Sequence, residues 1–238
     1  MFAGKLTDIE KRSFRLHIVY NIIEGLLFGF FLLNEFIFLK SLNGSEIHVG
    51  LLFLFSMAVF VPLVLFNEFL RRTFNKRKLI RVTALLTRLP LLIFFIFPSE
   101  INSHNASLYH YLFLFIFLIY YLGTPVILPT INLLLRNAYI NDNFGKLYGY
   151  ATTVNKVMVL IGTFFFGQLL DLDNYAFRYV YPILGLAGVT GLFFLSNIKV
   201  TIPRPDIKLP FFAAVKKSAL RLKDIIVKDK AYLHYETA

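Results

Sequence analysis

Six long apolar segments constrain this chain more than any other feature of its sequence. With only short polar stretches between them, they occupy residues 16–39, 49–70, 79–97, 108–135, 147–170 and 177–198. A helix needs about 20 mostly apolar residues to cross the hydrocarbon core of a bilayer. Soluble domains are about 45–50% apolar, whereas this chain of 238 residues is 57% hydrophobic. The sequence therefore predicts an all-α membrane protein with six transmembrane helices.

The basic residues predict the orientation of these helices. Of the 25 Lys and Arg, 21 lie in residues 1–15, 71–81, 136–146 and 199–230. The connections on the opposite side hold only Lys40 and Arg178. Cytoplasmic loops carry the excess of Lys and Arg in membrane proteins. We therefore expect a multi-pass protein of the cell (inner) membrane with both termini in the cytoplasm, and we assign the net charge of +11 to topology and not to nucleic-acid binding.

A shorter amphipathic segment follows the six spans. Apolar residues recur there at helical spacing, with Lys and Arg on the other faces: Phe211, Phe212, Val215, Ala219, Leu222 and Ile226. Pro203 and Pro205 separate the segment from the last span. We therefore divide the chain into a transmembrane bundle at 1–200 and a cytoplasmic linker at 201–238 whose amphipathic helix lies on the membrane surface. A solvated basic tail is the alternative.

Three ionisable residues fall inside the predicted spans. Glu24, Arg88 and Lys156 each lie about eight or nine residues beyond the cytoplasmic start of their helix. At a rise of about 1.5 Å per residue, all three reach one depth, about 12–14 Å from that start. An ionisable group within a membrane helix is costly unless it is paired or hydrated, so it marks a functional site by default.

The residues around these charges predict a cavity for a substrate or a coupling ion. Its expected members come from the first, third, fourth and fifth spans: Asn21, Glu24, Phe28, Arg88, Tyr120, Tyr121, Thr124, Asn155 and Lys156. Gly25 and Gly29 lie on a neighbouring stripe suited to close helix packing. The structural alternatives are a Glu24–Lys156 pair that only fixes helix register, an Arg88 that snorkels to the interface, and tyrosines that only pack.

The chain lacks the signatures of most enzyme and metal sites. It contains no Cys, and its five His show no ligand spacing. No P-loop, H-E-x-x-H motif or nucleophile elbow is present in the sequence. We therefore expect no catalytic residues, no metal and no cofactor.

Two stretches resemble the major facilitator superfamily of transporters. Residues 141–171 (NDNFGKLYGYATTVNKVMVLIGTFFFGQLLD) are similar to the loop and fifth helix of many members. The connection at 67–78 keeps the basic cluster of the loop signature of that family, but it lacks the acid at its usual place, and Asn75 replaces a Gly. The resemblance implies a cytoplasmic gate there, in which Glu68 substitutes for the acid beside Arg71, Arg72, Lys76, Arg77 and Lys78.

The resemblance covers essentially the whole chain as one six-helix half. It implies a 3+3 inverted repeat, a central site and alternating access, and hence transport of a small solute, with a proton as a candidate coupling ion. The first and fourth spans become equivalent, interrupted at Glu24-Gly25 and Gly123-Thr124-Pro125. A second half is then required, either beyond Ala238, in a dimer partner or in a separate chain.

Two other functions remain open at this stage. A non-transporting scaffold or a degenerate transporter remnant is compatible with the altered loop signature. A membrane-embedded enzyme is a weaker alternative, because it requires a cluster of carboxylates or His near one interface.

Overall fold

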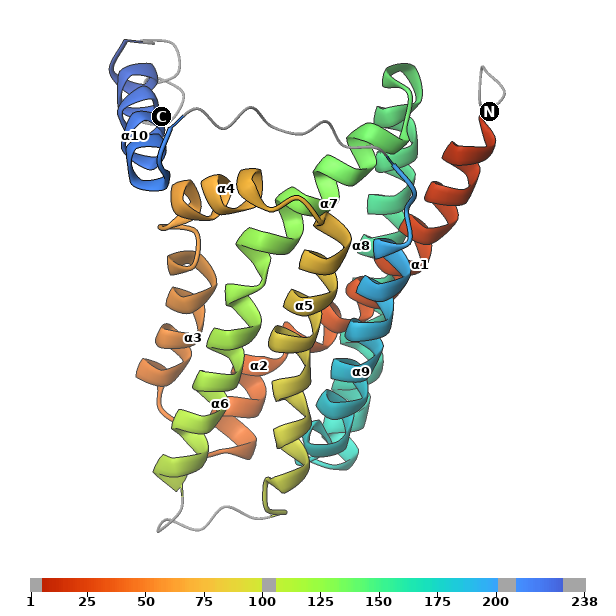
Figure 1. Ribbon diagram of the computed structural model, residues 1–238. Helices are drawn as coiled ribbons and strands as arrows, with labels where there is room; N and C mark the ends of the chain where they lie inside the picture. The colour runs from red at the N-terminus through yellow and green to blue at the C-terminus, as the bar shows by residue number, and fades with distance from the viewer. Residues whose placement is uncertain (1–5, 100–105, 201–208, 229–238) are drawn as a thin grey trace.

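The computed structural model describes residues 6–99, 106–200 and 209–228, and this part of the chain is helical without a strand (Figure 1). Five helices are long and apolar enough to cross a membrane, and the number rises to six if one bent pair counts as a single span. The prediction of an all-α membrane protein with up to six spans is confirmed at this level.

The first span is not a single helix. α1 (Asp8–Phe31) runs unbroken through Gly25 and ends near Leu32, after which come the short α2 (Asn34–Phe36) and a π-helical turn, η1 (Ile37–Ser41). The expected interruption at Glu24-Gly25 is therefore wrong. Gly25 serves close packing instead, and the break lies nearer the far end of the span.

The second and third spans each change geometry next to a proline. α3 (Glu46–Ala58) and α4 (Leu63–Arg72) are bent by 45° where Pro62 cannot donate a backbone hydrogen bond. α5 (Lys76–Arg88) continues as a 3₁₀ helix, η2 (Leu89–Ile96), which has Pro90 in its first turn. Arg88 therefore lies at the point where the third span tightens.

The fourth span breaks at Gly123 as expected, between α6 (Ala106–Leu122) and α7 (Thr124–Ala138). A Cβ on Gly123 would lie 2.9 Å from the Thr87 hydroxyl oxygen, so the close approach of this break to α5 requires glycine. The remaining helices are α8 (Asn141–Leu172), α9 (Phe177–Ser196) and α10 (Phe211–Lys228).

α1 and α8 form the most extensive helix pair of the bundle. A Cβ on Gly25 would lie 2.5 Å from the Asn155 carbonyl oxygen, and one on Gly29 would lie 2.3 Å from that of Val159. The Thr163 hydroxyl also donates a 2.9 Å hydrogen bond to the Gly29 carbonyl. The two backbones thus meet at a distance that only glycine permits.

One end of the bundle gathers the predicted basic connections. α1 begins there, α9 ends there, and the α4–α5 and α7–α8 connections lie there as well (Figure 1). This arrangement agrees with the basic segments lying on one side of a membrane. That this side faces the cytoplasm stays a prediction.

The predicted amphipathic helix forms as α10 and packs beside α4 (Figure 1). Arg72 donates a 2.6 Å hydrogen bond to the Leu209 carbonyl, and its guanidinium carbon lies 5.5 Å from the Phe211 ring centroid. Residues 201–208, with the two prolines, and 229–238 lie outside the described part. Contact with a membrane surface stays a prediction.

Candidate functional site

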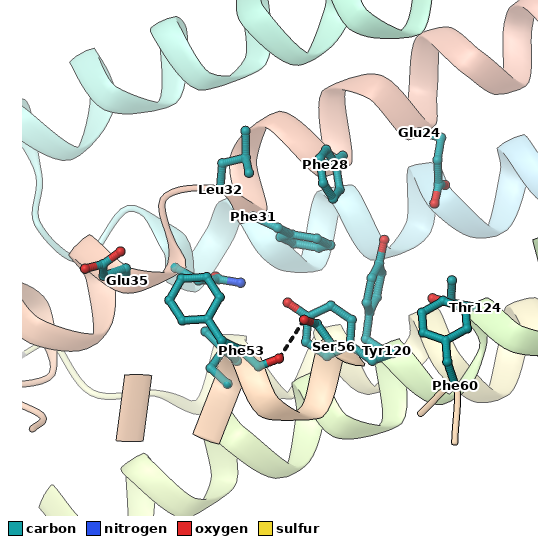
Figure 2. A pocket seen from close by; sticks show the side chains of 13 residues that line it. Glu24, Phe28, Phe31, Leu32, Glu35, Phe53, Ser56, Phe60, Tyr120 and Thr124 are labelled. Atoms are coloured by element: carbon teal, nitrogen blue, oxygen red, sulfur yellow. Dashed lines mark hydrogen bonds between the residues drawn. The ribbon is translucent and has the colours of Figure 1, made fainter. Parts of the chain in front are cut away.

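A pocket of about 350 Å³ opens between the first, second and fourth spans (Figure 2). It lies along α1 and α2 on one side and against α3, α6 and α7 on the other. Its lining residues are Glu24, Phe28, Phe31, Leu32, Asn34, Glu35, Leu52, Phe53, Ser56, Phe60, Tyr120, Tyr121 and Thr124. A volume of this size is typical of small-molecule sites.

Five of the predicted cavity residues line this pocket: Glu24, Phe28, Tyr120, Tyr121 and Thr124. The sequence did not indicate the contribution of the second span, which is Leu52, Phe53 and Ser56 of α3 and Phe60 of the α3–α4 turn. Ser56 was a weak signal, as a polar residue in an apolar span. Its direction depends on the α3–α4 bend, which hydropathy does not reveal.

Glu24 and Arg88 meet at one end of the pocket. Arg88 Nη2 donates a 2.7 Å hydrogen bond to Glu24 Oε1. The Arg88 guanidinium carbon lies 3.9 Å from the Tyr120 ring centroid, and the Tyr120 hydroxyl points toward Glu24 (Figure 2). The predicted common depth of Glu24 and Arg88 is therefore confirmed, and Arg88 does not snorkel, since its side chain is only 4% exposed.

This ion pair is incompletely satisfied. Glu24 Oε2 and the Nε and Nη1 atoms of Arg88 are buried without a hydrogen-bond partner among the described residues. A carboxylate and a guanidinium usually form two parallel hydrogen bonds, and unpaired buried polar atoms are costly. One acceptor on Glu24 and two donors on Arg88 therefore remain buried and unpaired at this ion pair.

Lys156 does not join this pair. Its side chain is exposed on α8 and forms no ion pair within the described residues, so the structural alternative of a Glu24–Lys156 pair is wrong. Lys156 and Asn155 are consecutive residues of α8, so their side chains point from different faces of the helix. Asn155 instead donates a 3.1 Å hydrogen bond to the Asn21 carbonyl, so Asn21 and Asn155 join α1 to α8 and do not line the pocket.

A second buried carboxylate, Glu10, fastens the ends of α1 and α8. Its Oε2 accepts hydrogen bonds from the backbone N–H and hydroxyl of Thr7, at 2.9 and 3.0 Å. Its Oε1 accepts from the Ile140 backbone N–H at 3.1 Å and from the Asn143 side chain at 3.0 Å. A negative charge at two helix N-termini is favourable. The role of Glu10 at the start of α1 could have been predicted, because Thr7-x-x-Glu10 before an apolar run is the sequence motif of a capping box.

His17 and Tyr139 form a buried contact near Glu10. Nδ1 of His17 lies 3.1 Å from the Tyr139 hydroxyl. Burial, together with the charge of Glu10, raises the pKa of Tyr139 well above its usual value. The contact joins α1 to the α7–α8 connection.

The predicted gate cluster is organised around Glu68. Glu68 is buried and accepts hydrogen bonds from Arg71 at 2.9 Å and from Arg72 at 2.6 Å. Lys76 donates to the Leu70 carbonyl, while Arg77 is half-buried and Lys78 is exposed. Glu68 thus binds two arginines of its own helix, and Arg72 extends the network to Leu209.

The described residues contain no group of three or more His, Asp or Glu side chains arranged to hold a metal ion. Comparison with known proteins finds no family model, no curated protein and no solved structure that matches this chain. Function is therefore argued from the pocket and its surroundings.

Proposed function

We propose that this chain is one six-helix half of a secondary transporter of the major facilitator type, which moves a small solute across the membrane by alternating access. The observation that carries the proposal is the pocket beside Glu24. It opens among three spans that are each interrupted, at Leu32, at Pro62 and at Gly123. Interrupted helices around a polar site are a recurring feature of transporters.

The open side of this pocket supports a partner half. Phe28, Leu32 and Phe53 line it and are each about half exposed, at 49%, 52% and 57%. Glu24 and Glu35 lie among them, and a carboxylate that faces acyl chains is expensive. A second six-helix unit over this face would enclose the carboxylates in a central cavity. That unit can be a continuation of this chain, a second copy or a separate chain.

A static scaffold is the competing function. It would fill its interior with apolar side chains, because replacing a buried ion pair by packed apolar residues is often neutral or stabilising. The incompletely paired Glu24 and Arg88 beside an open pocket favour a site that binds something.

Accessibility of the pocket from both membrane faces tests the proposal. These 238 residues contain no Cys, so a Ser56→Cys variant reports on the pocket alone once any cysteine of a second half is replaced by serine. In proteoliposomes, a membrane-impermeant thiol reagent should label this cysteine when added from either face. The full-length protein, with its second half if one follows, is used for the assay.

Leu160→Cys is the matched control. Leu160 lies on α8, is 71% exposed and does not line the pocket. Lipid-facing thiols react slowly with charged reagents, so this variant should stay unlabelled from both faces. Labelling of Ser56→Cys from one face only, under every condition tried, would reject alternating access and favour the scaffold.

A further inference from the structure

The pocket beside Glu24 carries an acidic and aromatic lining. Among the described residues that line it are two carboxylates, Glu24 and Glu35, and no Lys, Arg or His. The two carboxylates lie toward opposite ends of the labelled side chains (Figure 2). Arg88 lies behind Glu24 and offsets one negative charge. The pocket therefore keeps a net negative charge, which Glu35 supplies.

The space between the carboxylates is walled by aromatic rings. Phe28, Phe31, Phe53, Phe60, Tyr120 and Tyr121 all line it. The face of an aromatic ring attracts cations, more strongly where water is excluded. The protein already uses this attraction at one wall, because the Arg88 guanidinium lies over the Tyr120 ring at 3.9 Å.

The carboxylate at the Glu24 end also favours a ligand that carries positive charge. Oε1 of Glu24 accepts a hydrogen bond from Arg88, while Oε2 of Glu24 and two donors of Arg88 are buried without a partner within the described residues. An ionised carboxylate can only accept hydrogen bonds. An anionic ligand would face two carboxylates here, and no basic side chain lines the pocket to receive it.

We infer that the solute of this pocket is an organic cation with an apolar or aromatic body. Its charged group lies toward the carboxylates, and its body lies against the phenylalanine and tyrosine rings. This inference rests on the proposed transport function for its biological meaning, but binding can be measured without transport.

Equilibrium dialysis with two probes of the same shape tests the sign of charge. Radiolabelled tetraphenylphosphonium and tetraphenylborate are presented to the purified protein in nanodiscs, with empty nanodiscs as the blank. The cation should bind saturably and at least about tenfold more tightly than the anion. Equal or tighter binding of the anion, or saturable binding of neither probe, would overturn the inference.

Single charge removals locate the site. Glu35→Gln changes an exposed side chain, so the protein should remain folded, and it should weaken tetraphenylphosphonium binding about fivefold. Glu46→Gln removes another exposed carboxylate, which does not line the pocket, and binding should stay unchanged. Equal affinities of the two variants would place the cation elsewhere and reject this site.

The role of Glu24 in cation binding is tested with a single and a double variant. Glu24→Gln alone leaves Arg88 buried without its partner, so Glu24→Gln with Arg88→Gln is measured as well. Both should bind the cation about tenfold more weakly, and monodisperse elution shows that each is folded. Wild-type affinity in the folded double variant would contradict a role for Glu24.

Failure here is distinguishable from failure of the transport proposal. Two-sided labelling of Ser56→Cys with no preference for the cation would leave transport standing and reject the solute class. A preference for the cation with one-sided labelling would leave a cation-binding pocket in a protein that does not alternate.

Discussion

Arg88 reaches Glu24 from a different helix, and its Nη2 donates a 2.7 Å hydrogen bond to Glu24 Oε1. The two residues are 64 positions apart in the chain, and their pairing joins α5 to α1 beside the pocket. One helix thus supplies the acid that lines the site, while another holds that acid in place.

Removing Arg88 should destabilise the protein more than removing the pair. Arg88→Met leaves Glu24 partly buried without a counter-charge, and loss of one partner of a buried pair costs about 3–5 kcal/mol. Glu24→Gln with Arg88→Met should recover a large part of this loss. The measurement is thermal stability in detergent, taken as the temperature at which heating halves the height of the monodisperse size-exclusion peak. Lys156→Gln is the control, since that exposed side chain should matter little.

Tyr120 should act through its ring more than through its hydroxyl. Tyr120→Phe keeps the ring beneath the Arg88 guanidinium and should change thermal stability little. Tyr120→Leu removes the ring and should cost about 2 kcal/mol, from the lost cation–π contact and from imperfect packing. Equal losses in the two variants would show that the hydroxyl dominates instead.

Gly29→Ala should be strongly destabilising. The added Cβ would lie 2.3 Å from the Val159 carbonyl oxygen, which is backbone and cannot rotate away. Overpacking of this kind costs about 1–3 kcal/mol. Gly149→Ala on α8 meets no atom within 4 Å and should be neutral or slightly stabilising. Tolerance of both substitutions in thermal unfolding would mean that α1 and α8 separate more easily than the structure shows.

Glu10→Ala should loosen the ends of α1 and α8 together. It removes the acceptor for four hydrogen bonds, two from Thr7 and one each from Ile140 and Asn143. Loss of a helix cap costs about 1–2 kcal/mol. Hydrogen exchange should rise in the first turn of both helices. Asp8→Ala changes a fully exposed carboxylate in the same turn and should leave the exchange of α8 unaltered.

Arg72→Gln should release α10 from α4. The substitution removes the hydrogen bond to the Leu209 carbonyl, the contact with the Phe211 ring and the ion pair with Glu68. Tryptic cleavage at Lys216, Lys217 and Arg221 should become about fivefold faster, because cleavage follows the population of the open state. Arg77→Gln removes the same charge from the same connection but keeps these contacts. Equal cleavage rates would show that Arg72 does not hold the helix.

Hydropathy and charge were sufficient to predict the spans and the side of the bundle on which the basic connections gather. They also predicted the depth at which Glu24 and Arg88 meet, because the rise per residue of a helix is fixed. The break at Gly123 was readable from the glycine and the proline beside it.

The contact partners of individual side chains could not be predicted from hydropathy and charge. Choosing Arg88 over Lys156 for Glu24 requires the rotation of α5 and α8 about their axes. That rotation is set by backbone contacts such as the one at Gly29. The pocket face of α3 was missed because the bend before Pro62 and the packing of the whole bundle decide where Phe53 and Ser56 point.

The glycine contacts between α1 and α8 also determine which parts of the bundle are free to shift. The backbones of α1 and α8 are in direct contact at Gly25 and Gly29, and Glu10 joins the two helices again at their ends. The two helices should therefore move together as a rigid unit. A change in the shape of the pocket beside Glu24 must then come from the opposite wall. There, α6 and α7 meet at Gly123 and α3 meets α4 before Pro62, so these two joints are where the wall can flex.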